Sequence, residues 1–406
     1  IDVAQKRWLE NRLQQVFHSW GYHRIITSTL ERLDTLMAGG AVERSTVIHL
    51  QDLEEEVLGL RPELTASIAR TAVTRMAGAP FPQRLYYTAN VFRKSPKVSH
   101  NRQQEFFQAG VELLGGGGLV ADSEILLLVA DCMRALGLSQ STDGGVPWYL
   151  VLGEAGLTRS LFSSFPEALR QSVRQAIARL DRITLETLPL NPELQHLALL
   201  LMDLRGKPGD VLQQVSSLDL DATQRQAVNN LKSLMDLLEE TVSPIADETT
   251  AKPQIILDLS LVQTFDYYTG IVFEVVSPLA TGQRVLAQGG RYDQLLALYH
   301  PDGETIPGIG FSFNIEDIHQ VLLMGDSLPD RTPTSDWLVV ARTPEAFTAA
   351  FAKAQTLRDE APQLRVEMDL SGAISVEAIY EYARQRRISR ICWMEAGGTS
   401  TIEEVN

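Results

Sequence analysis

The sequence has few of the residues and patterns that mark metal, redox or nucleotide-binding proteins. Its two cysteines, Cys132 and Cys392, lie far apart and lack the paired spacing of a zinc site or a disulfide framework, so both are interpreted as core residues. None of the seven histidines forms a pair at metal-ligand spacing. No G-x-x-x-x-G-K-[ST] loop is present, and GIGFSFN lacks the context and glycines of a dinucleotide site. We therefore expect neither a metal nor a cofactor.

Long apolar runs are also missing. The longest, at residues 125–130 and 197–202, fall well short of the roughly 20 residues that a membrane-spanning helix requires, and no signal peptide opens the chain. The chain has 406 residues, of which 44% are apolar, which is enough for two or three globular domains. These features predict a cytoplasmic protein with no membrane partner. Because the chain begins at Ile1, we also expect further residues before it.

Positive charge is in deficit, since the formal net charge is −15. Such a chain repels a phosphate backbone unless a local basic face compensates. Residues 334–406 hold 8 Lys/Arg against 11 Asp/Glu, although Arg384, Arg386, Arg387 and Arg390 cluster at one predicted helix end. A solvated helix C-terminus explains this cluster at least as well as RNA binding does. We expect no nucleic-acid partner.

The first 322 residues alternate between sheet-like and helical patterns. Residues 5–20 have helical spacing, and the strand-like residues 24–30 follow Gly21. After a helix at about 63–76, two strand-like runs at 84–92 and 105–114 are predicted to pair as an antiparallel hairpin. Residues 154–242 are mostly helical, with breaks at Pro166, Pro189 and Pro208, and strands return at Ile255.

The C-terminal part has a different pattern. A linker at about 326–335 is rich in Pro, Ser and Thr, and strands then alternate with helices through residues 336–394. This alternation predicts a small α/β domain with a mainly parallel sheet.

Two short segments carry polar residues with more than one interpretation. In LRPELTASIAR, Glu63 directly precedes a helix, where capping alone would explain an acid. In EFFQAGVELLG, the alternation of a strand places Phe106, Gln108, Gly110 and Glu112 on one face. That face suits a polar pocket, but an antiparallel sheet can also keep one solvated side. The residues of this strand leave both interpretations open.

Together and in order, several motifs resemble those of histidyl-tRNA synthetases, which are class II aminoacyl-tRNA synthetases. WGYHRIITSTLE is similar to motif 1, FRKSPKVSHNRQQEFFQAGVELLG to motif 2, and IPGIGFSFNIEDI to motif 3, while LVQTFDYYTGIVFE and QGGRYDQLL resemble the histidine-recognition elements. The resemblance implies an α+β fold, with an antiparallel sheet flanked by helices and self-association as a dimer through motif 1. It further implies a synthetase-like core at 1–153 and 254–325, a mainly helical insertion at 154–253, and a C-terminal α/β domain at 334–406 resembling an anticodon-binding domain.

By this resemblance, most of a histidine site is present. Glu63, Thr65 and Gln108 match the residues that receive the α-ammonium of the ligand, and Arg93 matches the motif 2 arginine. A buried ammonium without a carboxylate partner would be costly, which agrees with the first of these roles.

The imidazole side of that site is similar as well. Glu112 and Tyr268 match the residues that read the ring, with Tyr267 beside them. An acceptor and a hydroxyl on the two ring nitrogens would distinguish histidine from apolar residues of similar size.

The positions that would activate histidine with ATP depart from the family pattern. Ser95 replaces a glutamate that meets adenine, Gln104 replaces a loop arginine, Gln263 replaces the histidine-specific arginine, and Asp317 replaces the motif 3 arginine. Adenylate formation concentrates negative charge that enzymes stabilise with fixed cations. We therefore predict that the chain holds histidine but has no catalytic residue for its activation.

A synthetase-like chain with these changes resembles the regulatory subunits of ATP phosphoribosyltransferase, and cyanobacterial members in particular. This resemblance implies a non-catalytic subunit, with L-histidine as its ligand and the short-form catalytic subunit as its partner, that acts in the first step of histidine biosynthesis. Two alternatives remain: a divergent histidyl-tRNA synthetase and a stand-alone histidine-binding module.

Overall fold

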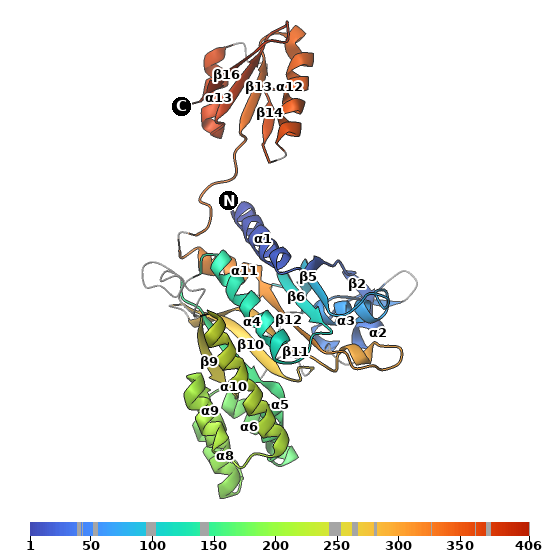
Figure 1. The fold of residues 1–406 in the computed structure, drawn as a ribbon, viewed down its shortest axis with the longest axis vertical. Helices are drawn as coiled ribbons and strands as arrows, with labels where there is room; N and C mark the ends of the chain where they lie inside the picture. The colour runs from blue at the N-terminus through green and yellow to red at the C-terminus, as the bar shows by residue number, and fades with distance from the viewer. Residues whose placement is uncertain are drawn as a thin grey trace. The chain divides into compact units, whose positions relative to one another are not determined.

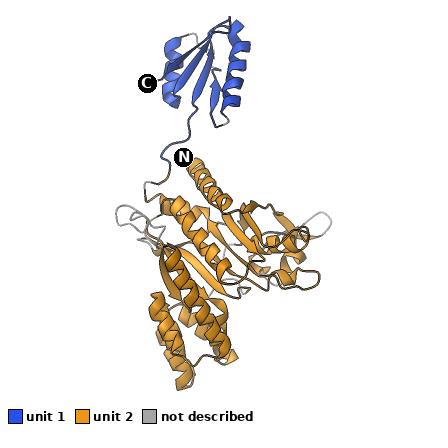
Figure 2. Ribbon diagram, viewed as in Figure 1, with its two compact units in different colours: residues 1, 329–406 blue, residues 2–328 orange. Residues whose placement is uncertain are grey.

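The structure is a computed structural model that divides into two compact units. It describes residues 1–38, 42, 44–51, 56–94, 103–138, 146–242, 253–261, 267–279, 282–325, 327–361, 363–370 and 375–405. One unit consists of residues 2–328, and the other of residue 1 and residues 329–406 (Figure 2). Among the described residues, no helix is both long and apolar enough to cross a membrane.

The larger unit is built on a mixed sheet in which the described residues supply nine strands (Figure 1). Neighbouring strands pair antiparallel with two exceptions. The strand β1 (His23–Arg24) runs parallel to β5 (Gln83–Phe92), and β7 (Tyr149–Glu154) runs parallel to β9 (Gln254–Asp258). The predicted hairpin is confirmed, because β5 and β6 pair antiparallel along their whole length. In spatial order the strands are β1 (His23–Arg24), β5 (Gln83–Phe92), β6 (Glu105–Leu114), β12 (Gly308–Asn314), β11 (Gly282–Arg291), β10 (Ile271–Leu279), β7 (Tyr149–Glu154), β9 (Gln254–Asp258) and β8 (Arg205–Gly206).

The two faces of this sheet bury different sets of side chains. On β6, Ala109, Val111 and Leu113 belong to a large apolar cluster with the helices α1 (Asp2–Ser19), α4 (Gly118–Ala135) and α11 (Ile315–Leu322). The alternate β6 residues face a second cluster formed with α3 (Thr65–Val73) and the short η2 turn (Leu296–Leu298). The face with Gln108 and Glu112 is therefore covered, and the solvated alternative for it is wrong.

A small three-stranded sheet lies next to α3, and the sequence patterns did not predict it. The predicted strand at 24–30 is wrong in extent, because only residues 23–24 and 30–32 of this region pair with other strands. A small sheet of short strands lacks a long alternating run, and so its local signal is weak. Its elements are β2 (Leu30–Arg32), α2 (Leu33–Met37), η1 (Arg44–Thr46), β3 (Ile48–Gln51) and β4 (Val57–Leu60).

Residues 155–242 are almost entirely helical, as their periodicity predicts (Figure 1). Pro166 is the N-cap of one helix, and Pro208 begins another, which agrees with the predicted breaks. Asp181 and Asn191 cap two further helices through hydrogen bonds from Thr184 N and Leu194 N. The helices are α5 (Ala155–Ser163), α6 (Glu167–Ala178), α7 (Arg182–Thr187), α8 (Pro192–Asp203), α9 (Pro208–Ser216) and α10 (Ala222–Val242).

The smaller unit is an α/β domain, as predicted. Its two long helices pack on opposite faces of the sheet, because their buried side chains fall into two separate apolar clusters. The sheet is not wholly parallel, since its last strand pairs antiparallel with β15. The elements are β13 (Trp337–Ala341), η3 (Pro344–Ala346), α12 (Phe347–Glu360), β14 (Val366–Met368), α13 (Val376–Arg386), β15 (Arg390–Met394) and β16 (Ser400–Glu404).

Candidate functional site

Glu63 lies in the turn before α3. Its side chain is buried and accepts hydrogen bonds from Ala66 N, at 3.0 Å to Oε1 and 3.2 Å to Oε2. Burial raises the pKa of Glu63 to about 7, against the opposing effects of hydrogen bonds from Ala66 and Thr65 and of the charge on Arg93. Glu63 therefore caps the helix and is also a buried acid whose ionised form a ligand cation would stabilise.

Glu112 is the second buried acid of the site and lies in the middle of the large sheet. It is 1% exposed and accepts a 2.7 Å hydrogen bond from Thr65 Oγ1 at its Oε1 atom. The Tyr292 hydroxyl donates to the other carboxylate oxygen, Oε2. Burial raises the pKa of Glu112 to about 8, although both hydroxyl donors act to lower it. The charge on Glu63 adds to the rise, so the two acids influence each other's ionisation.

Three tyrosines surround these acids. The ring centroids of Tyr267 and Tyr268 are 4.9 Å apart, and Tyr267 meets Tyr292 edge-on at 6.0 Å and 88°. Burial raises the pKa of the Tyr267 and Tyr292 hydroxyls well above the usual range, so both remain hydrogen-bond donors at neutral pH. With Glu63, Thr65 and Glu112 they form what we call the carboxylate–tyrosine cluster.

Glycines on neighbouring strands make space for this cluster. A Cβ atom at Gly310 would lie 1.9 Å from Glu112 Oε2, and one at Gly290 would lie 2.7 Å from Tyr268 Cδ1. Side chains cannot approach so closely, and so both positions require glycine. Gly310 belongs to GIGFSFN, and this contact gives its glycine a role unrelated to a dinucleotide.

Arg93 lies close enough to Glu63 for their charges to interact, and Gln108 lies on the same face of β6 as Glu112. Gln108 is buried on β6, two residues before Gly110, which lies against Tyr87. Arg93 Nε donates to Pro62 O at 2.8 Å, and burial lowers the pKa of Arg93 while the charge on Glu63 opposes that change. The structure thus places Glu63, Thr65, Arg93, Gln108, Glu112, Tyr267 and Tyr268 around the same face of the sheet.

Tyr292 is a cluster residue that the sequence analysis missed. It lies in QGGRYDQLL, so the signal was present, but Arg291 is the more conspicuous residue of that segment. Arg291 takes no part in the cluster, because its Nη2 pairs with Asp122 Oδ1 at 2.5 Å and its Nη1 with Asp293 Oδ1 at 3.0 Å. Arg159 Nη2 also supports the cluster, since it donates to Tyr268 O at 2.8 Å.

Of the four positions that we predict to depart from the synthetase pattern, two lie within the described residues. Ser95 and Gln263 lie outside the described residues. Gln104 is exposed, and its backbone carbonyl accepts a 2.8 Å hydrogen bond from Arg93 N. Asp317 lies in the first turn of α11, where its Oδ1 atom pairs with Arg284 Nη1 at 2.6 Å.

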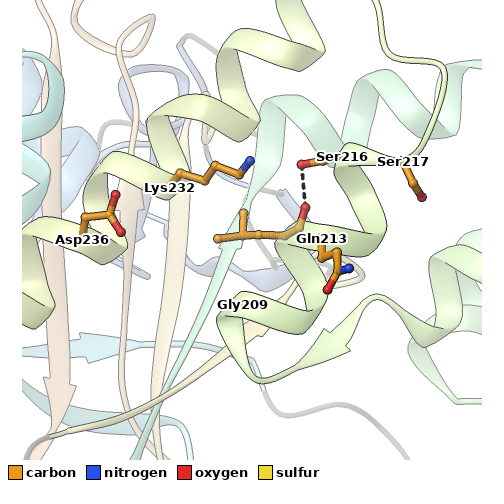
Figure 3. A pocket seen from close by; sticks show the side chains of 7 residues that line it. Gly209, Gln213, Ser216, Ser217, Lys232 and Asp236 are labelled. Atoms are coloured by element: carbon orange, nitrogen blue, oxygen red, sulfur yellow. Dashed lines mark hydrogen bonds between the residues drawn. The ribbon is translucent and has the colours of Figure 1, made fainter.

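Other features of the structure make weaker sites. A hollow of about 610 Å³ lies between α9 and α10, but the side chains of Gln213, Lys232 and Asp236 that line it are exposed (Figure 3). A second hollow, of about 430 Å³, is lined by Arg205 and Asp258, which pair with each other at 3.3 Å. Within the described part of the chain, no group of three or more His, Cys, Asp or Glu side chains is placed to hold a metal ion.

Known proteins match this sequence along the whole chain. The family model described as histidyl-tRNA synthetase matches residues 1–318. An ATP phosphoribosyltransferase regulatory subunit from Trichormus variabilis is 61% identical over 406 residues, which cover 100% of this chain and 96% of that protein. One with the same name from Nostoc punctiforme is 62% identical over 405 residues, with the same coverage.

Solved structures show the same fold. An ATP phosphoribosyltransferase regulatory subunit/histidyl-tRNA synthetase from Bacillus halodurans has a TM-score of 0.75 at 25% identity and covers 96% of this chain and 94% of its own. A histidyl-tRNA synthetase from Nostoc sp. PCC 7120 also has a TM-score of 0.75, at 18% identity, with coverage of 98% and 93%. The likeness to this synthetase concerns the fold alone.

Proposed function

The chain belongs to the family of ATP phosphoribosyltransferase regulatory subunits, and we propose that it supports the short-form catalytic subunit and transmits histidine feedback to it. The observation that carries this proposal is the identity of 61% to a relative of that name over the whole chain. In the proposed complex the partner condenses ATP with phosphoribosyl pyrophosphate, which is the first step of histidine biosynthesis. The cytoplasm is the proposed location.

L-Histidine is the ligand that the carboxylate–tyrosine cluster suits best. An α-ammonium beside Glu63 would satisfy a buried carboxylate that currently accepts from Ala66 N. At the other end, Glu112 and Tyr268 would read the two imidazole nitrogens, one as an acceptor and one through its hydroxyl. Thr65 and Tyr292, which both donate to Glu112, would orient that carboxylate.

The proposed subunit carries out no chemistry of its own. Histidine activation by ATP needs fixed cations around the reacting phosphate. Asp317 carries a negative charge at one such position, and it also neutralises Arg284. Gln263 and Gln104 are neutral where the synthetase pattern has arginine. These changes disfavour the divergent synthetase and support a binding role.

We propose that the chain self-associates as a dimer through the outer face of the small three-stranded sheet. Leu30 and Leu50 lie on its outer face and are 47% and 42% exposed, and Ile26 in the preceding segment is 81% exposed. Exposed apolar residues gathered in one region mark association surfaces. A second copy of the chain could cover this face with its own equivalent residues, as a two-fold dimer requires.

We further propose that the mainly helical residues 154–253 are an insertion in a synthetase-like core of 1–153 and 254–325. Residues 334–406 then form a C-terminal domain that resembles an anticodon-binding domain without acting on tRNA.

Reconstitution with the catalytic subunit from the same genome tests the proposed function. The two chains should co-purify, and only their mixture should form phosphoribosyl-ATP from ATP and phosphoribosyl pyrophosphate. Added L-histidine should inhibit that reaction. If the chain binds histidine but neither associates with the catalytic subunit nor changes its rate, the stand-alone module becomes the better interpretation.

A further inference from the structure

The turn that carries Glu63 is held from both sides by residues outside the carboxylate–tyrosine cluster. On one side, Arg61 N donates to Thr29 O at 3.1 Å. On the other side, Phe92 N donates to Arg61 O at 2.9 Å, and Arg93 Nε donates to Pro62 O. The turn therefore bridges the segment before β2 and the end of β5.

The Arg61 side chain strengthens this bridge. Its guanidinium is buried and donates from Nη1 to Thr27 O at 2.9 Å and Ser28 O at 3.2 Å, and from Nε to Asn90 O at 2.9 Å. Three carbonyl acceptors in different directions require a planar group with several fixed donors, which arginine has and lysine lacks. Burial lowers the pKa of Arg61, and the charge on Glu31 opposes that change.

Glu31 holds the helix that follows the turn. This buried residue of β2 accepts a 2.7 Å hydrogen bond from Ser67 Oγ at Oε1 and pairs with Arg70 Nη2 at Oε2. Positions 63, 67 and 70 follow helical spacing, so Glu31 contacts α3 one to two turns beyond Glu63. Glu31 faces inward with its cross-strand neighbour Gly59, whereas Leu30 lies on the opposite, outer face of the small sheet.

We propose that Arg61 and Glu31 are positioning residues for the histidine site, which fix the turn and the first turns of α3 so that Glu63 meets the ligand ammonium. This inference rests on the proposed function, because it assumes that Glu63 receives that group. A carboxylate contributes to binding only when its position is set before the ligand arrives, and supporting residues set that position. Neither residue needs to touch the ligand.

A double-mutant cycle on the full-length chain tests this role, with L-histidine affinity measured by calorimetry. The variants are Glu31→Gln, Arg61→Lys and Glu63→Gln, together with Glu31→Gln/Glu63→Gln. Ser67→Ala is a milder variant that removes only the hydroxyl bound to Glu31 Oε1. The matched control is Glu124→Gln, because Glu124 accepts from both Arg84 and Tyr22 in the same way but lies on α4, outside the cluster. Thermal unfolding of each variant verifies that it folds.

We expect Glu31→Gln and Arg61→Lys to weaken histidine binding by roughly tenfold, as typical losses of supporting contacts do. Ser67→Ala should weaken it by roughly twofold to fivefold and the Glu124 control by less than about twofold. In the Glu63→Gln background, Glu31→Gln should have little further effect, because both changes act through one carboxylate.

Full additivity, or wild-type affinity in folded Glu31→Gln and Ser67→Ala variants, would overturn the positioning role while the proposed histidine site stands. Wild-type affinity in Glu63→Gln would instead remove the proposed site, and this inference with it.

Discussion

Arg284 Nη1 lies 2.6 Å from Asp317 Oδ1, so the acid that we predict in place of a synthetase arginine has a cation partner of its own. The pair joins β11 to the first turn of α11, where Asn314 Oδ1 also accepts from Asp317 N at 3.4 Å. Asp317 is thus integrated into the fold, and its negative charge neutralises a nearby arginine that could otherwise bind phosphate.

The first prediction concerns this pair. The wild-type chain should show no histidine-dependent exchange of pyrophosphate into ATP. The Asp317→Arg variant should show none either, because the change sets a second cation beside Arg284 and leaves Gln263 neutral. The exchange assay should be run beside an active histidyl-tRNA synthetase such as that of Nostoc sp. PCC 7120. Robust exchange by the wild-type chain would show that it is a divergent histidyl-tRNA synthetase instead.

The second prediction is that histidine binding releases protons. Glu63 has a pKa of about 7 without ligand, so about half of its population is protonated near neutral pH. An ammonium group favours the ionised form and lowers that pKa, so binding should release up to about half a proton from Glu63 at about pH 7. Calorimetry in two buffers of different ionisation enthalpy measures the release, and Glu63→Gln should reduce it. An observed enthalpy independent of the buffer would contradict this expectation.

A third prediction follows from the raised pKa of Glu112, about 8 in the folded chain against an ordinary value of 4.5. A folded-state pKa above the unfolded value stabilises the protein at low pH, and that contribution is lost as pH rises from about 4.5 to about 8. Glu112→Gln removes the titration and keeps the shape. The melting temperature of the variant minus that of the wild type should therefore increase from about pH 5 to about pH 9 without ligand. A difference that is constant with pH would show that Glu112 titrates normally.

The fourth prediction concerns Gly310. Its substitution by alanine sets a Cβ atom in the space of Glu112 Oε2, and so Gly310→Ala should lower the free energy of unfolding by about 1 to 3 kcal/mol and weaken histidine binding. Gly78→Ala is the matched control, because a Cβ atom there meets nothing within 4 Å. Chemical denaturation measures both variants. Equal stability of the two would mean that Glu112 and the Val111 carbonyl do not fill the space beside Gly310.

The fifth prediction links the site to the partner. A subunit that carries out no chemistry inhibits its partner only if ligand binding and catalytic state are coupled, typically by about 1 to 3 kcal/mol. In the reconstituted complex, Glu112→Ala should leave assembly and turnover near the wild-type level and raise the inhibitory histidine concentration about tenfold or more, since it leaves a ligand donor unpaired. Inhibition at an unchanged concentration would place the feedback site on the catalytic subunit.

The sequence by itself predicted the main sheet, the helical segment, the small α/β domain and most residues of the candidate site. The order of the motifs predicted the synthetase-like sheet, and the alternation of residues 105–114 placed Gln108 and Glu112 on one face. Local periodicity carries this information, because neighbouring side chains in a strand or helix report which side is buried.

Contacts between segments distant in the sequence were decided only by the tertiary structure. Nothing near Asp317 indicates its pairing with Arg284, and nothing near Glu31 indicates that its carboxylate holds α3 through Ser67. Tyr292 likewise meets Glu112 across 180 residues of chain. The three-stranded sheet escaped prediction for the same reason, since its short strands are stabilised by packing against α2 and by the contacts of Glu31 with α3 rather than by their own pattern. Such pairings depend on which surfaces the folded chain brings together, and local residue patterns carry no information about contacts between distant segments.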